Sequence, residues 1–130
     1  MRFKKLTPML WTSDLKATAE FYKCKLNFEL DALREDWGWC SMHKDDVEIM
    51  FALPNEHTPY EGPHATATFY IYTDEVDELW EQLKNDSEVF YSIANFSYNM
   101  REFAIKDNNG YILQFGRQLR EGEKPEEETE

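Results

Sequence analysis

The sequence predicts an α+β fold in which a βαβββ unit occurs twice within one chain of 130 residues. Two observations predict it: the order of strand-like and helix-like segments repeats, and a proline-rich stretch separates the two copies. The helical positions Leu15 and Tyr22 recur 61 residues later as Val76 and Leu83. We interpret this as an internal repeat. An unrelated α+β domain with two similarly spaced helices is the alternative.

The first unit is expected over about residues 6–54. Residues 6–12 have the composition of a strand, and Ser13 or Asp14 can cap a helix that begins at Leu15. Within that helix, apolar residues at near-helical spacing form one face. Three strands separated by polar turns are expected next, over residues 28–33, 37–42 and 47–53.

The second unit is expected over about residues 65–118, after a linker at 55–64. The segment 54–63 contains three prolines and Gly62, which neither a helix interior nor a central strand tolerates. Asp74 is predicted to cap the second helix. The strands of this unit are expected over residues 65–72, 89–94, 101–106 and 111–115. Residues 1–118 thus form one domain, and the charged residues 119–130 are expected to be a disordered acidic tail.

The chain is strongly acidic, with a formal net charge of −12. Nucleic acid and anionic membrane surfaces are therefore disfavoured as partners, whereas a cationic ligand is mildly favoured. Solubility alone is the simpler explanation for most of these charges. No apolar run reaches the roughly 20 residues that a membrane span needs.

A cytoplasmic location is expected. The basic N-terminal segment is followed by polar Thr12, Ser13 and Asp14 rather than by the apolar stretch of a signal peptide. Cys24 and Cys40 lie outside any CxxC motif, as is typical of reduced thiols.

Three segments, in this order, resemble the glyoxalase/bleomycin resistance protein/dioxygenase (vicinal oxygen chelate) superfamily: TSDLKATAEFYKCKLNF, YTDEVDELWEQL and REFAIKDNNGYILQF. The resemblance covers about residues 6–117 and is nearest to the bleomycin-resistance branch. Asn27 and Asn108 depart from it, since Gly and Pro are usual there. It implies that each unit curls into half of an open barrel, a curved mixed sheet with its helix outside, and that the chain forms a homodimer.

The resemblance also implies where a metal would bind. Superfamily enzymes usually hold a divalent cation with His or Glu in four slots, which fall here at Thr7, Met50, Thr68 and Gln114. Two hydroxyls, a thioether and an amide are poor ligands for such a cation, so no metal and no cofactor is expected. His43 and His57 are interpreted as solvated loop residues, and His64 lies four positions before the expected slot, so none of the three is expected to bind a metal.

A ligand-binding wall is predicted from the alternation of side chains along strands. Val47, Ile49 and Phe51 should face the helix, which leaves Glu48 and Met50 on the opposite face. Trp37 and Trp39 share a face and suit stacking on a planar or cationic ligand. Packing of a dimer interface or a filled barrel is the alternative. The predicted ligand-binding residues are Trp11, Trp37, Trp39, Glu48, Met50, Thr68, Tyr70 and Gln114.

Three functions stay open at this point. The leading one is metal-independent binding and sequestration of a small aromatic or cationic compound, as in bleomycin resistance. The second is a lyase, isomerase or dioxygenase of the same superfamily, with Glu48 as a general base. The third is a dimeric scaffold that binds no ligand. No serine nucleophile elbow and no glycine-rich phosphate loop competes with these.

Overall fold

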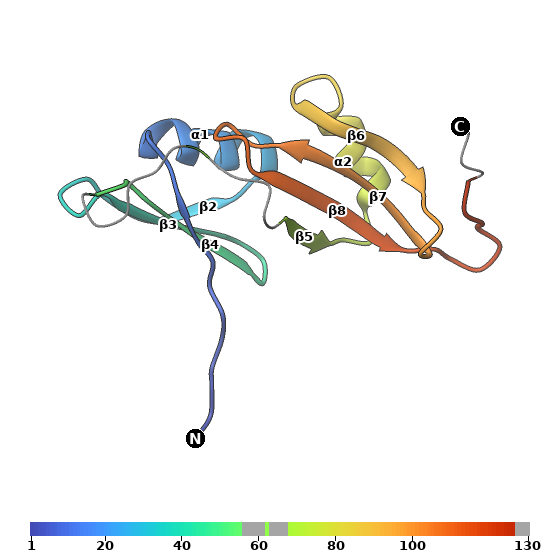
Figure 1. Ribbon diagram of the computed structural model, residues 1–130, viewed down its shortest axis with the longest axis horizontal. Helices are drawn as coiled ribbons and strands as arrows, with labels where there is room; N and C mark the ends of the chain where they lie inside the picture. The colour runs from blue at the N-terminus through green and yellow to red at the C-terminus, as the bar shows by residue number, and fades with distance from the viewer. Residues whose placement is uncertain (56–61, 63–67, 127–130) are drawn as a thin grey trace. The chain divides into compact units, whose positions relative to one another are not determined.

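The computed structural model describes residues 1–55, 62 and 68–126, and its elements follow the order βαβββ twice. The chain divides into two units, Met1–Pro63 and His64–Glu130, each with its own mixed four-stranded sheet and one helix. The predicted fold class is therefore confirmed (Figure 1). The predicted linker lies almost entirely outside the described residues. No helix in the described part is long and apolar enough to cross a membrane.

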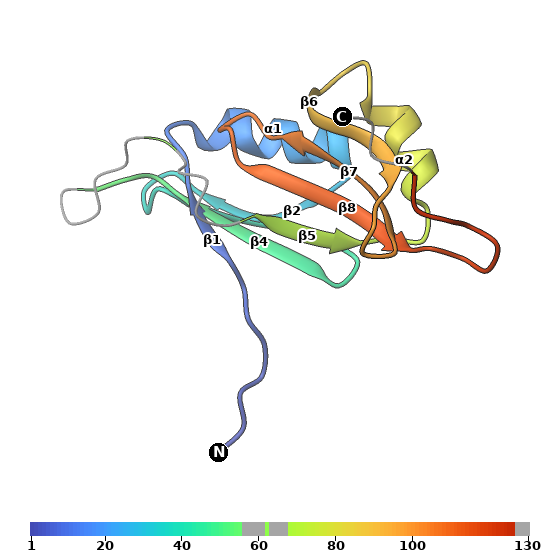
Figure 2. The same cartoon turned by 45° about the vertical axis from the view of Figure 1, so that its right-hand side comes forward.

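Unit one contains β1 to β4 and α1, and its sheet has the order β1-β4-β3-β2. β1 runs parallel to β4 and the other neighbours are antiparallel. In Figures 1 and 2, α1 lies along one face of this sheet. The elements are β1 (Met9–Trp11), α1 (Leu15–Leu26), β2 (Glu29–Arg34), β3 (Trp39–Lys44) and β4 (Val47–Ala52).

Both ends of α1 follow from local chemistry. The Asp14 carboxylate accepts a hydrogen bond from the backbone N–H of Ala17, which confirms the predicted N-cap. Asn27 ends the helix in the left-handed conformation, with φ of 58°. Asparagine tolerates this conformation better than most residues, so it can stand where glycine is usual.

The core of unit one lies between α1 and the sheet. Tyr22 is fully buried, and its ring lies 5.4 Å from that of Phe28 and 4.9 Å from that of Phe51. Ile49 and Phe51 are buried, whereas Glu48 and Met50 are half-buried. The predicted division of β4 into a helix-facing and an opposite face is thus supported.

Unit two repeats the arrangement with the sheet order β5-β8-β7-β6. The helix α2 packs on β7 and β8, where the ring of Trp80 lies 5.2 Å from that of Phe103. The elements are β5 (Phe69–Tyr72), α2 (Val76–Leu83), β6 (Glu88–Asn95), β7 (Met100–Lys106) and β8 (Ile112–Gln118).

Two local predictions are wrong. The N-cap of α2 is Glu75, and no side chain makes a capping hydrogen bond, so Asp74 is not the cap. The middle strand of unit one begins at Trp39 and not at 37, because the chain turns over residues 34–38. There the N–H of Trp37 donates to the carbonyl of Arg34, and Gly38 adopts a φ of 63°.

The expected disordered tail is also corrected for the part that the structure describes. Residues 119–126 follow β8 and are hydrogen-bonded to unit two. Glu123 accepts two hydrogen bonds from Arg117, and the Asn95 side chain donates to the carbonyl of Lys124. The backbone N–H of Glu126 donates to the carbonyl of Asn95. Composition alone missed these specific partners.

Candidate functional site

The face of the unit-two sheet opposite α2 carries the principal candidate site. Cross-strand partners share a face, and the register pairs Tyr70 with Gln114 and Glu102 with Gly116. The alternating residue Phe103 instead packs against α2. Glu102 and Gln114 are therefore brought onto one open face, beside Tyr70.

Glu102 is the centre of this face. Its side chain has no exposed surface, yet it carries a carboxylate. Its Oε2 atom accepts hydrogen bonds from the Tyr91 hydroxyl and, at 3.3 Å, from the Gln114 amide, and the hydroxyls of Tyr70 and Tyr98 also interact with the carboxylate. No Lys or Arg of the described part forms an ion pair with it. A buried carboxylate is thus supported by neutral donors only.

Three tyrosines surround the Glu102 carboxylate. Burial and the hydrogen bond to Glu102 raise the pKa of Tyr91 to about 12. Burial also raises the pKa of Tyr70, to which the charge of Glu102 adds, and the pKa of Tyr98, to which a hydrogen bond to Glu102 adds. All three phenols consequently keep their protons at neutral pH. We call Glu102, Tyr70, Tyr91, Tyr98 and Gln114 the Glu102 cluster.

The amide of Gln114 is held at both ends. The Thr68 hydroxyl donates a hydrogen bond to Oε1 at 2.7 Å, and Nε2 donates one to the Tyr91 hydroxyl at 2.8 Å. The predicted residues Thr68, Tyr70 and Gln114 therefore do lie together.

The two metal slots of unit two, Thr68 and Gln114, do not fit a divalent cation. The one oxygen of Gln114 that could bind metal already accepts a hydrogen bond from the Thr68 hydroxyl. The described residues contain no group of three or more His, Cys, Asp or Glu side chains placed to hold a metal ion. The superfamily's metal chemistry therefore has no suitable donor set in this part of the chain.

Gly116 is required by the closeness of Tyr70. A Cβ atom on Gly116 would lie 2.0 Å from the Tyr70 hydroxyl oxygen and 2.9 Å from the Cβ of Glu102. Both distances are shorter than atoms tolerate, so the missing side chain makes room for the phenol. The same geometry shows that the Tyr70 hydroxyl and Glu102 are neighbours.

The face of the unit-one sheet opposite α1 is aromatic and apolar, unlike the corresponding face of unit two. The register places Trp11 and Trp39 on either side of Ala52, and Met50 next to Ser41. The ring of Trp39 lies 6.2 Å from that of Trp37. These aromatic and apolar groups form the predicted wall, although Trp37 comes from the turn before the strand.

Two of the predicted ligand-binding residues of unit one, Trp37 and Glu48, already interact with other side chains of the chain. The guanidinium of Arg34 lies 3.9 Å from the centre of the exposed Trp37 ring, so an internal cation already occupies one face of that ring. Glu48 forms an ion pair with Lys5. The ion pair with Lys5 therefore does not favour Glu48 as a general base.

His43 is not a loop residue. It lies on β3, where Nδ1 is 2.7 Å from a carboxylate oxygen of Asp31 and Nε2 is 3.4 Å from one of Glu29. His57 and His64 lie outside the described residues.

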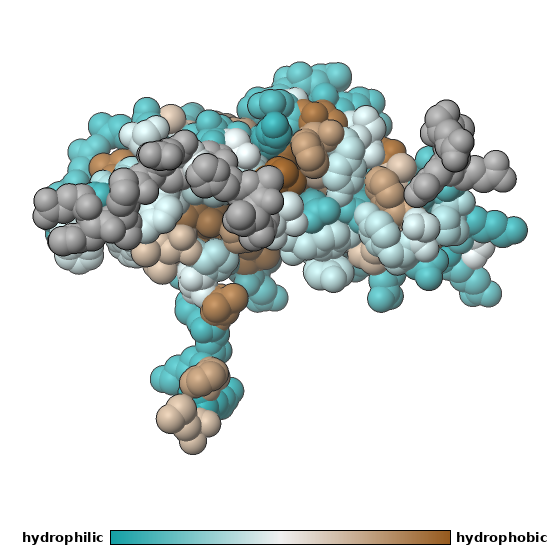
Figure 3. All heavy atoms as spheres, viewed as in Figure 1, coloured by the Kyte–Doolittle hydropathy of each residue, from teal (hydrophilic) through white to brown (hydrophobic). Residues whose placement is uncertain are grey.

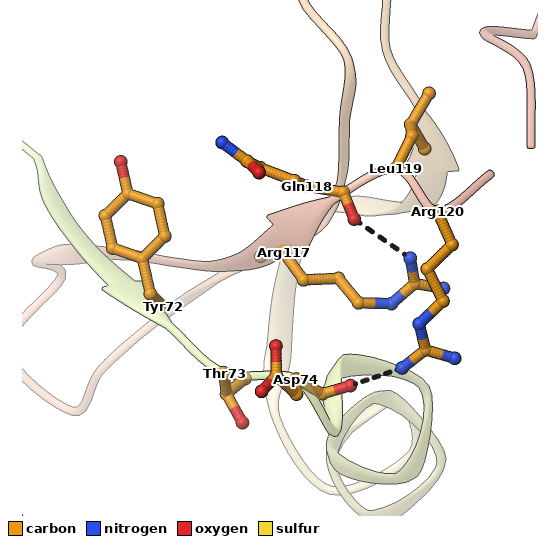
Figure 4. Close-up of a pocket in the computed structure, with 8 residues that line it drawn as sticks. Tyr72, Thr73, Asp74, Arg117, Gln118, Leu119 and Arg120 are labelled. Atoms are coloured by element: carbon orange, nitrogen blue, oxygen red, sulfur yellow. Dashed lines mark hydrogen bonds between the residues drawn. The ribbon is translucent and has the colours of Figure 1, made fainter.

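A pocket of about 480 Å³ lies where β5 and β8 end, and Figure 4 shows its lining. Its buried cation, Arg117, is already paired with Glu123 at 2.6 Å and with Asp77 at 3.6 Å. Arg120 donates to the backbone carbonyl of Asp74. Arg101 also forms an ion pair with Asp77, at 2.7 Å. The arginines here are structural.

The residues that the sequence analysis missed are Glu102, Tyr91 and Tyr98. One signal was available for Glu102: in the strand 100–106 it alternates with the apolar residues Phe103 and Ile105. Tyr98 gave no signal, because it lies in the turn between β6 and β7. Its approach to Glu102 depends on the conformation of that turn.

Comparison with known proteins identifies the family. The model of the Glyoxalase/Bleomycin resistance protein/Dioxygenase superfamily matches residues 6–115. No curated protein matches the chain.

Solved structures share the fold at low sequence identity. A glyoxalase/bleomycin resistance protein/dioxygenase from Nocardioides is 22% identical with a TM-score of 0.74, covering 99% of this chain and 91% of that one. TioX from Micromonospora sp. ML1 is 14% identical with a TM-score of 0.73, covering 90% and 100%. A lactoylglutathione lyase from Agrobacterium tumefaciens is 19% identical with a TM-score of 0.68, covering 87% and 92%. These likenesses concern the fold alone.

Proposed function

The chain belongs to the glyoxalase/bleomycin resistance protein/dioxygenase superfamily, and we propose that it binds and sequesters a small aromatic or cationic organic compound without a metal. The observation that carries this proposal is Glu102: a completely buried carboxylate, surrounded by phenols, that no cation of the described chain neutralises.

The energetics of burial favour a positively charged ligand. A carboxylate in a low-dielectric site is costly unless hydrogen bonds or an opposite charge compensate it. Tyr91 and Gln114 supply neutral hydrogen bonds, and the other groups against the carboxylate, Tyr70 and Tyr98, are neutral phenols as well. An organic cation would provide the missing charge.

Aromatic rings add the contact area. The Tyr91 ring meets that of Phe96 edge to face at 5.5 Å, and Phe96 stacks on Tyr98 at 5.6 Å. Electron-rich ring faces attract cations and also stack on planar ligands. The net charge of −12 would increase the encounter rate of a cation with the protein.

Sequestration needs no chemical step. A protein in excess over its ligand lowers the free concentration by mass action, so neither a cofactor nor a nucleophile is required. We place this activity in the cytoplasm, in keeping with the free thiols of exposed Cys24 and buried Cys40.

The test is a binding titration by calorimetry with two aromatic cations, metal-free bleomycin and ethidium, on protein treated with EDTA. We expect saturable micromolar binding of at least one, weakened about tenfold or more in Glu102→Gln because a charge-assisted interaction is lost. Glu48→Gln is the matched control and should change the affinity by less than about twofold, since its charge is already paired with Lys5. Absence of saturable binding, or equal loss in both variants, would overturn the proposal.

We also propose that the protein is a homodimer whose N-terminal segment contacts the second copy. Residues 1–8 precede β1 as an extended trace in Figures 1 and 2, and apolar side chains stand out on this segment in Figure 3. Phe3 and Leu6 are almost fully exposed. Exposed apolar groups of this size call for a partner surface.

A further inference from the structure

We infer that residues 119–126, which we call the C-terminal strap, control access to Glu102 by holding in place the turn that covers it. The inference rests on the proposed function and adds the regulation of the same site. Glu102 has no exposed surface, so a ligand reaches its carboxylate only when a covering segment moves. Printed hydrogen bonds and ring contacts identify both that segment and what fastens it.

The cover is the turn between β6 and β7, residues 96–99. Tyr91 donates a hydrogen bond to Glu102, and the ring of Phe96 meets that of Tyr91 edge to face at 5.5 Å. Tyr98 stacks on Phe96 at 5.6 Å, and its hydroxyl interacts with the Glu102 carboxylate. Two aromatic side chains of one turn therefore cover the buried acid, and the outer one, Tyr98, is 57% exposed.

The C-terminal strap is hydrogen-bonded to both ends of this turn. At the first end, the backbone N–H of Glu126 donates to the carbonyl of Asn95 at 2.9 Å. The Asn95 side-chain amide donates to the carbonyl of Lys124 at 3.0 Å. At the second end, the backbone N–H of Leu119 donates to the carbonyl of Asn99 at 2.9 Å. The turn can therefore move away from the buried acid only if these bonds break or the strap moves with it.

An ion pair anchors the strap to unit two. Glu123 accepts hydrogen bonds from both terminal nitrogens of Arg117, at 2.6 Å and 3.0 Å, and a third from the backbone N–H of Arg120 at 2.6 Å. The Arg117 side chain is only 5% exposed, so it is a fixed anchor for the strap. A carboxylate that accepts two bonds from one guanidinium is among the stronger polar contacts in proteins.

Little apolar burial holds the strap in place. Residues 120–122 and 124–126 are exposed, and the segment forms neither a helix nor a strand. Segments of this kind open locally at a much lower cost in free energy than the strands of a core. The strap is therefore poised to open, and the ion pair between Glu123 and Arg117 determines how often it does so.

The test measures access to the Glu102 carboxyl in the full chain without any ligand. Accessible carboxyl groups are labelled with a carbodiimide and glycine ethyl ester, and mass spectrometry quantifies the label on each residue. We expect slow labelling of Glu102 in the unmodified chain. In Glu123→Gln it should be about tenfold or more faster, because the charge-assisted hydrogen bonds of the anchor are lost. Glu121→Gln is the matched control and should leave the rate unchanged, since Glu121 is an exposed strap residue without an ion pair in the described part.

Two further measurements separate opening of the strap from loss of the fold. Asp107 is a buried carboxyl at the opposite end of β7 from the covering turn, and its labelling should stay slow in Glu123→Gln. Glu126→Ala changes an exposed residue whose carboxylate accepts a hydrogen bond from the backbone N–H of Asn95 at 3.3 Å. It loosens only that end of the turn, so labelling of Glu102 should rise by about threefold in a chain that keeps its fold.

Each outcome has a distinct meaning. Fast labelling of Glu102 in the unmodified chain, or an unchanged rate in Glu123→Gln, would overturn the inference. Equal acceleration at Glu102 and Asp107 would overturn it too, because unit two would then have opened as a whole. The proposed function is tested separately, since labelling needs no ligand. If bleomycin and ethidium fail to bind while labelling still depends on Glu123, sequestration is overturned and the control of access stands.

Discussion

At the scale of single residues, the packing on the open face of unit two requires a glycine at position 116. The Tyr70 hydroxyl lies where a Cβ of residue 116 would be, beside the buried Glu102 carboxylate. The absence of a side chain at Gly116 thus allows the Tyr70 hydroxyl to lie close to Glu102.

Gly116→Ala is therefore expected to destabilise the fold by about 1–3 kcal/mol, the usual cost of overpacking a well-filled site. Tyr70→Phe in the same chain should recover part of this loss, because it removes the oxygen that lies 2.0 Å from the new methyl group. Urea unfolding of the two single variants and the double variant gives the coupling between the positions. Strict additivity of the two changes would contradict this account.

Residue-scale chemistry was only partly predictable from the sequence. Strand alternation placed Thr68 and Tyr70 on one face of their strand, because side chains on one strand face follow a period of two, and the structure brings both beside Gln114 on the neighbouring strand. It did not select Glu102, since a single acid in a strand is usually solvent-exposed. Its burial depends on phenols that come from β5, β6 and a turn, and sequence spacing does not report such contacts.

At the scale of elements, the predicted start of β3 was wrong because the backbone conformation of a single residue, Gly38, determines it. Gly38 adopts a positive φ, so the turn continues to that residue and the strand begins later than its composition indicated. The apolar periodicity of α1 and α2 was sufficient to predict both helices. Asp74, in contrast, has the residue type of a cap without the hydrogen bond of one.

The segment after β8 yields a prediction on pH. Hydrogen bonds from the Arg117 guanidinium, with one from the backbone N–H of Arg120 added, lower the pKa of Glu123 from an ordinary value of 4.5 to about 2. A carboxyl whose pKa is lower in the folded state stabilises the fold above its unfolded pKa, and that contribution disappears as the pH falls from about 4.5 to about 2.

Glu123→Gln should therefore lower the unfolding temperature at pH 7, and the difference from the unmodified chain should shrink steadily below pH 4.5 and vanish near pH 2. Thermal unfolding followed by circular dichroism over this range measures it. Glu121→Gln, two residues away and without an ion pair in the described part, is the control and should show no such convergence. A difference that stays constant with pH would show that the carboxylate charge is not responsible.

At the scale of the whole molecule, the charge of the chain is unevenly distributed. Arg2, Lys4 and Lys5 are the only charged side chains in residues 1–13, so this segment carries +3 while the rest carries −15. A basic, apolar segment and an acidic body are complementary, and opposite charges guide association between copies. This distribution supports the proposed homodimer.

The dimer prediction can be tested by sedimentation equilibrium. We expect a mass of twice the 15.5 kDa of one chain, and a monomer for the double variant Phe3→Asp/Leu6→Asp, which replaces two exposed apolar contacts with charges that the acidic body repels. Trp37→Ser is the control, because it removes an exposed apolar side chain outside the segment and should leave the dimer intact. If the unmodified chain is a monomer, or if the double variant remains a dimer, the N-terminal segment does not mediate association. High salt should weaken the dimer of the unmodified chain, since screening reduces the attraction between segment and body.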